Sequence, residues 1–120
     1  MKVAVTSQGP YLDSPMDPRF GRARYLVVVE TDTGAFSAVD NSPASDAVQG
    51  AGIQAGKRVA ELGVEALITG HVGPKAFSTL EAAKIKVYTG AAGSVAQAIE
   101  QFKKGKLPQA AAADVDGHWV

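Results

Sequence analysis

The chain has 120 residues, 46% of them apolar, which is enough for one compact core and argues against a disordered chain. Twelve basic and twelve acidic residues give zero formal net charge, so the sequence lacks the basic footprint expected for binding nucleic acid or an anionic membrane. Because there is no Cys, disulfides, thiolate ligands for a metal and thiol nucleophiles are excluded. No apolar run has the length of a signal peptide or a membrane span, and we expect a cytoplasmic protein.

The first forty residues predict a strand, a long loop and a hairpin. Residues 3–5 are typical of a short buried strand. Residues 7–24 form an irregular segment with three prolines, and loops of this length are uncommon unless they carry a function. Residues 25–30 are rich in Val, residues 32–34 are a turn signal, and residues 35–39 alternate in polarity, which together predicts a β-hairpin.

The rest of the chain alternates between helices and strands. Apolar residues recur every three or four positions over residues 47–62, which predicts a helix. Residues 66–69 and 85–88 are apolar runs of strand length. Pro74 suits the first position of a second helix, and Ser94 suits the N-cap of a third helix with a buried apolar stripe.

This order predicts one α/β domain over residues 1–105, followed by a loosely held C-terminal tail at residues 106–120. A hairpin followed by βα units implies a mixed five-stranded sheet with helices on both faces, in three layers. In such sheets, ligands bind beyond the carboxyl ends of the parallel strands. Those ends are expected at residues 6–8, 69–73 and 89–93.

Pairs of glycines mark the turns after two of these strands. Gly70 and Gly73 bracket one turn, and Gly90 and Gly93 bracket the other, each before a predicted helix. The start of a helix exposes backbone N–H groups and the positive end of the helix dipole, so two neighbouring starts can bind an anion without a charged side chain. The alternative is that these short turns need glycine for their backbone conformation alone.

Polar side chains are expected close to the same edge. His71 lies inside the first turn, where it can donate a hydrogen bond to an anion or ligate a soft metal; the alternative is a surface histidine without a role. Residues 19–24 hold three of the twelve basic residues, which predicts anion recognition with Phe20 as an apolar wall. Alternatively, these arginines begin a solvated strand and pair with Asp13 and Asp17.

Two familiar phosphate-binding patterns are rejected. Residues 50–55 match the G-x-G-x-x-A form of a dinucleotide site, but no strand directly precedes them and no acidic residue follows at the required distance. Residues 55–58 lack the first glycine and the Ser or Thr of a P-loop. Hydrolysis also has little support, because the first strand carries no carboxylate and no nucleophile elbow is present. We therefore expect a binding protein and no enzyme.

A family resemblance is carried by five segments, at residues 2–6, 19–26, 50–52, 67–77 and 85–88. Together they resemble the dinitrogenase iron-molybdenum cofactor proteins, which implies a ribonuclease H-like fold and the binding or carriage of metal-sulfur clusters during cofactor assembly. The chain looks most like the branch of orange proteins of anaerobic bacteria, which implies a noncovalently held molybdenum-copper sulfide cluster. The alternative cargo is an iron-molybdenum or iron-sulfur cluster precursor. A cluster that brings its own sulfides fits a chain without Cys.

Residues and resemblance together predict a noncovalent carrier that holds its cluster through backbone amides, Arg and His at one sheet edge. The predicted cluster-binding residues are Arg19, Phe20, Gly21, Arg22, Ala23, Gly50, Ala51, Gly52, Thr69, Gly70, His71, Val72, Gly73, Gly90 and Ala91. His71 is also the candidate metal ligand. Two other functions stay open: a small enzyme that acts on a phosphorylated or nucleotide substrate at the same turns, and an adaptor to a partner ATPase.

Overall fold

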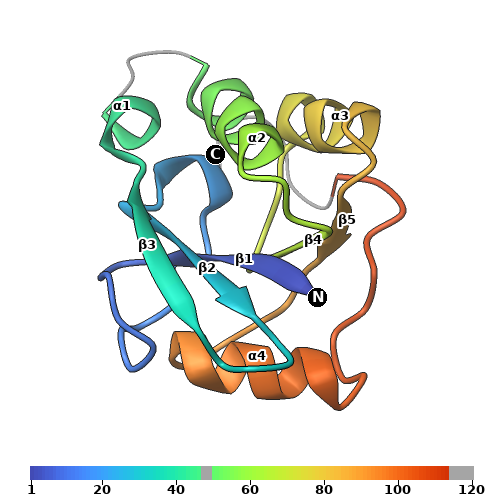
Figure 1. The fold of residues 1–120 in the computed structure, drawn as a ribbon. Helices are drawn as coiled ribbons and strands as arrows, with labels where there is room; N and C mark the ends of the chain where they lie inside the picture. The colour runs from blue at the N-terminus through green and yellow to red at the C-terminus, as the bar shows by residue number, and fades with distance from the viewer. Residues whose placement is uncertain (47–49, 114–120) are drawn as a thin grey trace.

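In the computed structural model, five strands form one mixed sheet in the order β3-β2-β1-β4-β5 (Figure 1). At its centre, β1 (Lys2–Ser7) pairs antiparallel with β2 (Tyr25–Glu30), which pairs antiparallel with β3 (Phe36–Asp40). On the other side of β1, β4 (Ala66–Ile68) and β5 (Lys86–Tyr88) extend the sheet in parallel. The predicted mixed five-stranded sheet is confirmed.

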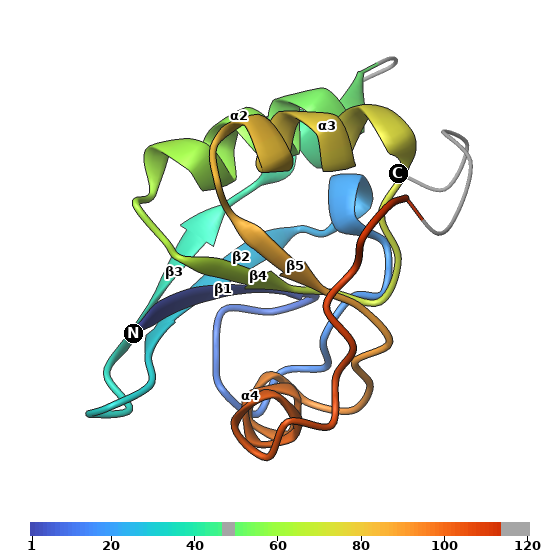
Figure 2. The ribbon, with the colours of Figure 1, turned by 90° about the vertical axis from the view of Figure 1, so that its right-hand side faces the viewer.

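Helices cover both faces of this sheet. Figure 2 shows α2 (Ala51–Glu61) and α3 (Pro74–Ala82) side by side on one face and α4 (Val95–Lys103) alone on the other. A short 3-10 helix, η1 (Phe20–Arg22), packs against α2 and against the single-turn helix α1 (Ser42–Ser45). No helix in the parts of the chain that the structure describes is long and apolar enough to cross a lipid bilayer.

The side chains of the strands alternate between two apolar layers. Leu26, Val28 and Leu67 point toward α2 and α3, whereas Val27 and Ile68 point toward α4. All of these side chains are buried. The continuous Val-rich sequence of β2 therefore reflects burial on both faces, as expected for a central strand.

The structure describes residues 1–46 and 50–113, and within them it differs from the sequence prediction in a few places. The first long helix begins at Ala51, not at Ala47; residues 47–49 lie outside the described residues. The helix α1 was not predicted, because a single turn around Pro43 is too short to show apolar periodicity.

The segment expected to be a loosely held tail is in part bound to the sheet. The amide of Thr89 donates to the carbonyl of Pro108 (3.3 Å), and the amide of Ala110 donates to the carbonyl of Val87 (2.7 Å). Residues 108–110 therefore cover the outer edge of β5. Residues 114–120 lie outside the described residues.

Candidate functional site

Hydrogen bonds join the end of β1 to Asp17, which lies just before η1. The amide of Asp17 donates to the carbonyl of Thr6 (2.9 Å), and the Thr6 hydroxyl donates to the carbonyl of Asp17 (2.6 Å). The same Thr6 hydroxyl is hydrogen-bonded to the hydroxyl of Thr69 at the end of β4 (2.9 Å). Because all three residues are buried, these bonds hold the ends of two parallel strands and residue 17 in one fixed arrangement.

Gly70 allows this segment to lie directly against the turn after β4. A Cβ atom on Gly70 would meet Cα and Cβ of Pro18 at 2.6 Å and its carbonyl oxygen at 2.8 Å, so only glycine fits. The amide of His71 donates to the carbonyl of Pro18 (2.7 Å), and a parallel β-bridge joins Arg19 to His71. The structure thus brings Arg19 beside His71, although they are far apart in the sequence.

The three arginines of residues 19–24 point to different partners. Arg19 is about half exposed (54%), and its Nε lies 3.8 Å from Oδ1 of Asp17. Arg22 donates from Nη1 to the carbonyl of Ser45 at the end of α1 (3.1 Å). Arg24 is directed away toward Asp40, at a distance of 4.0 Å between Nε and Oδ1. Arg19 and Arg24 therefore each lie near an acidic residue, but both guanidinium groups stay about half exposed.

Two helices begin at the sheet edge where β1 and β4 end. Leu62, at the other end of α2, accepts a bond from Nζ of Lys2 at the start of β1 (3.0 Å), so α2 begins at the opposite edge, where α3 also begins (Figure 2). Neither helix has a side-chain N-cap. In each helix the backbone amides of the first turn donate to no acceptor within residues 1–46 and 50–113. The amides concerned belong to Ala51, Gly52 and Ile53 in α2 and to Gly73, Lys75 and Ala76 around the start of α3.

We call residues 17–23, 50–53 and 70–76 the rim. Packing of η1 against α2, the bridge from Arg19 to His71 and the contact between α2 and α3 bring these three segments together. The rim combines helix-start amides, two positive dipole ends and an exposed guanidinium group. This combination of donors favours an anionic ligand.

The start of α4 does not share these properties, which corrects one prediction. Ser94 and Gln97 form a capping box, and the amides of Val95 and Ala96 donate to carbonyls of the residue 8–16 loop at 2.9 and 2.8 Å. The expectation of unpaired amides at this helix start is therefore wrong. A loop far away in the sequence supplies acceptors that no local pattern reveals.

Gly90 and Ala91 also use their amides inside the fold. Gly90 donates to the carbonyl of Gly70 (3.0 Å), and Ala91 donates to the carbonyl of Thr69 (3.3 Å). These bonds attach the turn after β5 to the turn after β4. Gly90 and Ala91 therefore stabilise the turn at residues 70–73, and their N–H groups are not available to a ligand.

Several predicted binding residues are buried. Phe20, Ala23, Thr69 and Val72 have no exposed surface, and Ala51 is 2% exposed. The expectation that Phe20 forms an apolar wall for a ligand is therefore wrong, because its ring packs in the core beneath α2 and α3. The four residues without exposed surface therefore support the rim from inside the fold and do not themselves face a ligand.

Sequence reasoning missed the role of Asp17. Its Oδ1 accepts a hydrogen bond from the amide of Arg19 (2.9 Å), which is the geometry of an Asx turn. An Asp two residues before the first arginine is the local signal for such a turn. From the sequence alone, Asp17 was expected only as a charge partner of the arginines.

Comparison with known proteins identifies the chain's relatives. A family model described as dinitrogenase iron-molybdenum cofactor matches residues 1–105. The chain belongs to this family. An uncharacterized protein from Methanocaldococcus jannaschii is 30% identical over 109 residues, which cover 89% of each chain.

Two solved structures of similar proteins extend the comparison. The apo form of the orange protein from Desulfovibrio gigas has 45% sequence identity and a TM-score of 0.92, over 95% of this chain and 96% of that one. A putative NifB protein from Thermotoga has 37% identity and a TM-score of 0.83, over 97% and 98% of the two chains. The predicted family resemblance, including the likeness to an orange protein, is confirmed.

The donor set of this dinitrogenase cofactor family member does not form a site for a single metal ion. Among residues 1–46 and 50–113, no three His, Asp or Glu side chains lie close enough to hold a metal ion, and the sequence has no Cys. His71 alone would supply one ligand. The rim therefore offers no complete ligand set for a bare metal cation within these residues.

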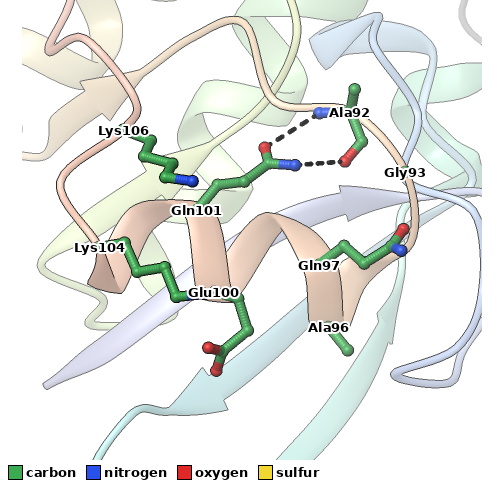
Figure 3. A pocket seen from close by; sticks show the side chains of 8 residues that line it. All are labelled: Ala92, Gly93, Ala96, Gln97, Glu100, Gln101, Lys104 and Lys106. Atoms are coloured by element: carbon green, nitrogen blue, oxygen red, sulfur yellow. Dashed lines mark hydrogen bonds between the residues drawn. The ribbon is translucent and has the colours of Figure 1, made fainter.

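The larger depressions described on this family member lie elsewhere. One of about 520 Å³ lies on the outer side of α4, where Gln101 is hydrogen-bonded to both the amide and the carbonyl of Ala92 (Figure 3). Another of about 420 Å³ lies between α2 and the α1 region. Neither depression is lined by residues of the rim, and Gly93, at the end of the turn after β5, lines the one on α4.

Proposed function

We propose that this protein binds and carries a metal-sulfide cluster of the molybdenum-copper type without a covalent bond to it. The observation that carries the proposal is the rim: uncapped starts of two helices beside an exposed arginine, in a chain that belongs to the dinitrogenase iron-molybdenum cofactor family and has no Cys. A thiometallate cluster is a large polarizable anion, so backbone amides and guanidinium groups suit it and carboxylates do not.

The energies of such contacts are sufficient for retention. Each charge-assisted N–H contact contributes about 1.5 to 3 kcal/mol, so a few of them hold the cluster tightly. Arg19 supplies an exposed charge at the rim, and the first-turn amides of α2 and α3 supply fixed donors. Gly50 is the N-cap of α2 and has a left-handed backbone (φ +73°), which leaves that helix start without a covering side chain.

Reconstitution tests the proposal directly. The apo-protein is mixed with tetrathiomolybdate and copper(I), freed of unbound reagent and measured by visible absorption. We expect charge-transfer bands that migrate with the protein. If none do so, the molybdenum-copper proposal is abandoned. An iron-molybdenum or iron-sulfur precursor, offered in a parallel arm, then becomes the cargo if it is retained.

The assignment of Arg22 and His71 to the site has its own test. Arg22→Ala and His71→Ala are compared with Arg24→Ala, a matched control from the same basic segment whose guanidinium is directed to Asp40. We expect weaker cluster retention in the first two variants and unchanged retention in the control. Unchanged retention in both site variants would remove these residues from the proposal.

The same preparation tests the alternative functions. A carrier of this kind has no catalytic residues, and we propose none for this chain. Thermal unfolding is measured with nucleotides and with thiomolybdate. Stabilisation by a nucleotide alone would favour an enzyme of phosphorylated substrates. Recovery of an ATPase in a pull-down with the loaded protein, but not with the apo-protein, would favour delivery to such a partner.

A further inference from the structure

Asp17 is a buried carboxylate at the edge of the rim, only 7% exposed. Its backbone is fixed to the end of β1 by the two bonds with Thr6. Its Oδ1 accepts a hydrogen bond from the amide of Arg19 at 2.9 Å and lies 3.8 Å from Nε of the same residue. One carboxylate oxygen thus contacts both the main chain and the guanidinium group of Arg19.

These two contacts have opposite consequences for an anion at the rim. The bond to the amide holds the Pro18-Arg19 segment in the turn that places Arg19 beside His71, and it therefore favours binding. The contact with Nε draws the guanidinium toward Asp17, and the carboxylate repels any nearby anion. An anionic cluster must therefore displace the Asp17 carboxylate as the partner of Arg19.

We propose that Asp17 is a positioning residue that sets how tightly the rim holds its anionic cargo, acting through Arg19 both as a structural support and as an internal competitor. This inference rests on the proposed function, because it assumes that the rim binds an anionic cluster. It predicts that substitutions of Asp17 can separate its hydrogen bond to the Arg19 amide from its competition with the cluster for the Arg19 guanidinium. A carrier benefits from such a competitor, because an internal carboxylate that replaces the cluster on Arg19 assists release.

Two substitutions at this position should change affinity in opposite directions. Asp17→Asn keeps an oxygen that can accept from the Arg19 amide but removes the charge, so thiomolybdate should bind about three- to fivefold more tightly, the size of one ion pair that is still open to solvent on the Arg19 side. Asp17→Ala removes the support as well, so binding should weaken about tenfold. Spectrophotometric titration with tetrathiomolybdate measures both dissociation constants.

A double-mutant cycle tests whether the effect passes through Arg19. In an Arg19→Ala background, Asp17→Asn should raise affinity clearly less than it does in the wild type, since the guanidinium for which the carboxylate competes is gone and only its direct repulsion of the anion remains. Asp13→Asn is the matched control: it removes the same charge from the same loop, and Asp13 forms no ion pair or hydrogen bond with the described residues. A gain in affinity from Asp13→Asn equal to that from Asp17→Asn would point to net charge and overturn the inference.

The outcomes separate the inference from the proposed function. If the wild-type protein retains no thiomolybdate, with or without copper(I), both fail. If the wild-type protein binds and Asp17→Asn binds equally or more weakly, the proposed function survives and the competition by Asp17 is wrong. Should Asp17→Ala fail to fold, Asp17→Asn and the cycle with Arg19→Ala still decide the matter.

Discussion

Two turns of this protein have the same spacing of glycines and opposite properties. Residues 70–73 and 90–93 both follow a parallel strand, begin and end with glycine, and precede a helix. The first leads into α3, whose early amides have no acceptor among the described residues. The second leads into α4, whose amides are bound by the capping box and the residue 8–16 loop.

The difference shows that a glycine-rich turn does not by itself create an anion site. Pro74 lacks an N–H group and Gly73 lacks a side chain, so nothing local closes the start of α3. Ser94 closes the start of α4 locally, and the loop closes it from a distance. Whether helix-start amides are available therefore depends on the capping residue and on what packs over it.

The largest expected effect is on ligand binding at the rim. Arg19→Ala should weaken cluster binding by about 1.5 to 3 kcal/mol, the value of a hydrogen bond to a charged group, because it removes the exposed guanidinium. Lys104→Ala, at the depression on α4, is the control with the same loss of charge and should change binding little. Thiomolybdate titration measures the affinity of both variants. An equal loss of affinity in Arg19→Ala and Lys104→Ala would mean that the rim and the α4 side do not differ in cluster binding.

A second expectation concerns the stability of the rim. Gly70→Ala forces a Cβ atom against Pro18 at 2.6 Å and should lower the free energy of unfolding by about 2 kcal/mol, as overpacking does. Gly50→Ala introduces no such contact and should lower it by about 1 kcal/mol, the strain of a non-glycine residue at φ +73°. Urea unfolding of the two variants measures the contrast.

The relative size of these two losses of stability tests why position 70 is glycine. If Gly50→Ala destabilises the protein more than Gly70→Ala does, the close approach of Pro18 is not the reason for glycine at position 70. Gly70→Ala should also weaken cluster binding, since it displaces Arg19 from His71.

Substitutions at the start of α4 should change the stability of the protein but not its affinity for the cluster. Ser94→Ala removes the N-cap side chain that accepts from the amide of Gln97 (3.1 Å), and it should lower the free energy of unfolding by about 1 kcal/mol. Thiomolybdate affinity should stay unchanged. Gln97→Ala removes the other half of the capping box and serves as a second variant with the same expected pattern. A clear loss of cluster binding in either variant would place α4 in the site.

Much of the fold could be predicted from local patterns. The Val-rich run of β2, the turn signal after it and the helical periodicity before Gly63 predict elements that the structure contains. The mixture of antiparallel and parallel strands could also be anticipated, because a hairpin pairs antiparallel and βα units impose parallel pairing. The juxtaposition of Arg19 and His71 followed from the rule that ligands gather at the carboxyl ends of parallel strands.

The features that escaped prediction depend on contacts between distant residues. The carbonyls of Leu12 and Ser14 satisfy the start of α4 from more than eighty positions away, and no periodicity reports this. The burial of Phe20 depends on how η1 packs against α2. The fit of Gly70 against Pro18 likewise needs the tertiary structure, since the backbone at Gly70 is not left-handed and shows no local reason for glycine.

The smallest expected effect concerns α1, whose first amide is bound by a carboxylate. Oδ1 of Asp40 accepts from the amide of Ser42 (2.8 Å), and the bonds with Ser42, with a smaller contribution from Arg24, hold the pKa of Asp40 below its usual 3.8. A depressed folded-state pKa stabilises the fold above the unfolded-state pKa, and this contribution is lost as pH falls through the folded-state pKa.

Asp40→Asn should therefore be slightly less stable than the wild type at neutral pH, with the difference shrinking below about pH 4. Urea midpoints from about pH 7 to about pH 2.5 test the sign. Ser42→Ala keeps the backbone N–H, the largest cause of the shift, and should show only part of the effect. A difference that grows in acid would mean that the Asp40 carboxylate is not held in its charged form by α1. Because the carbonyl of Ser45 in α1 accepts the side chain of Arg22, the cap at Asp40 also supports the position of Arg22 at the rim.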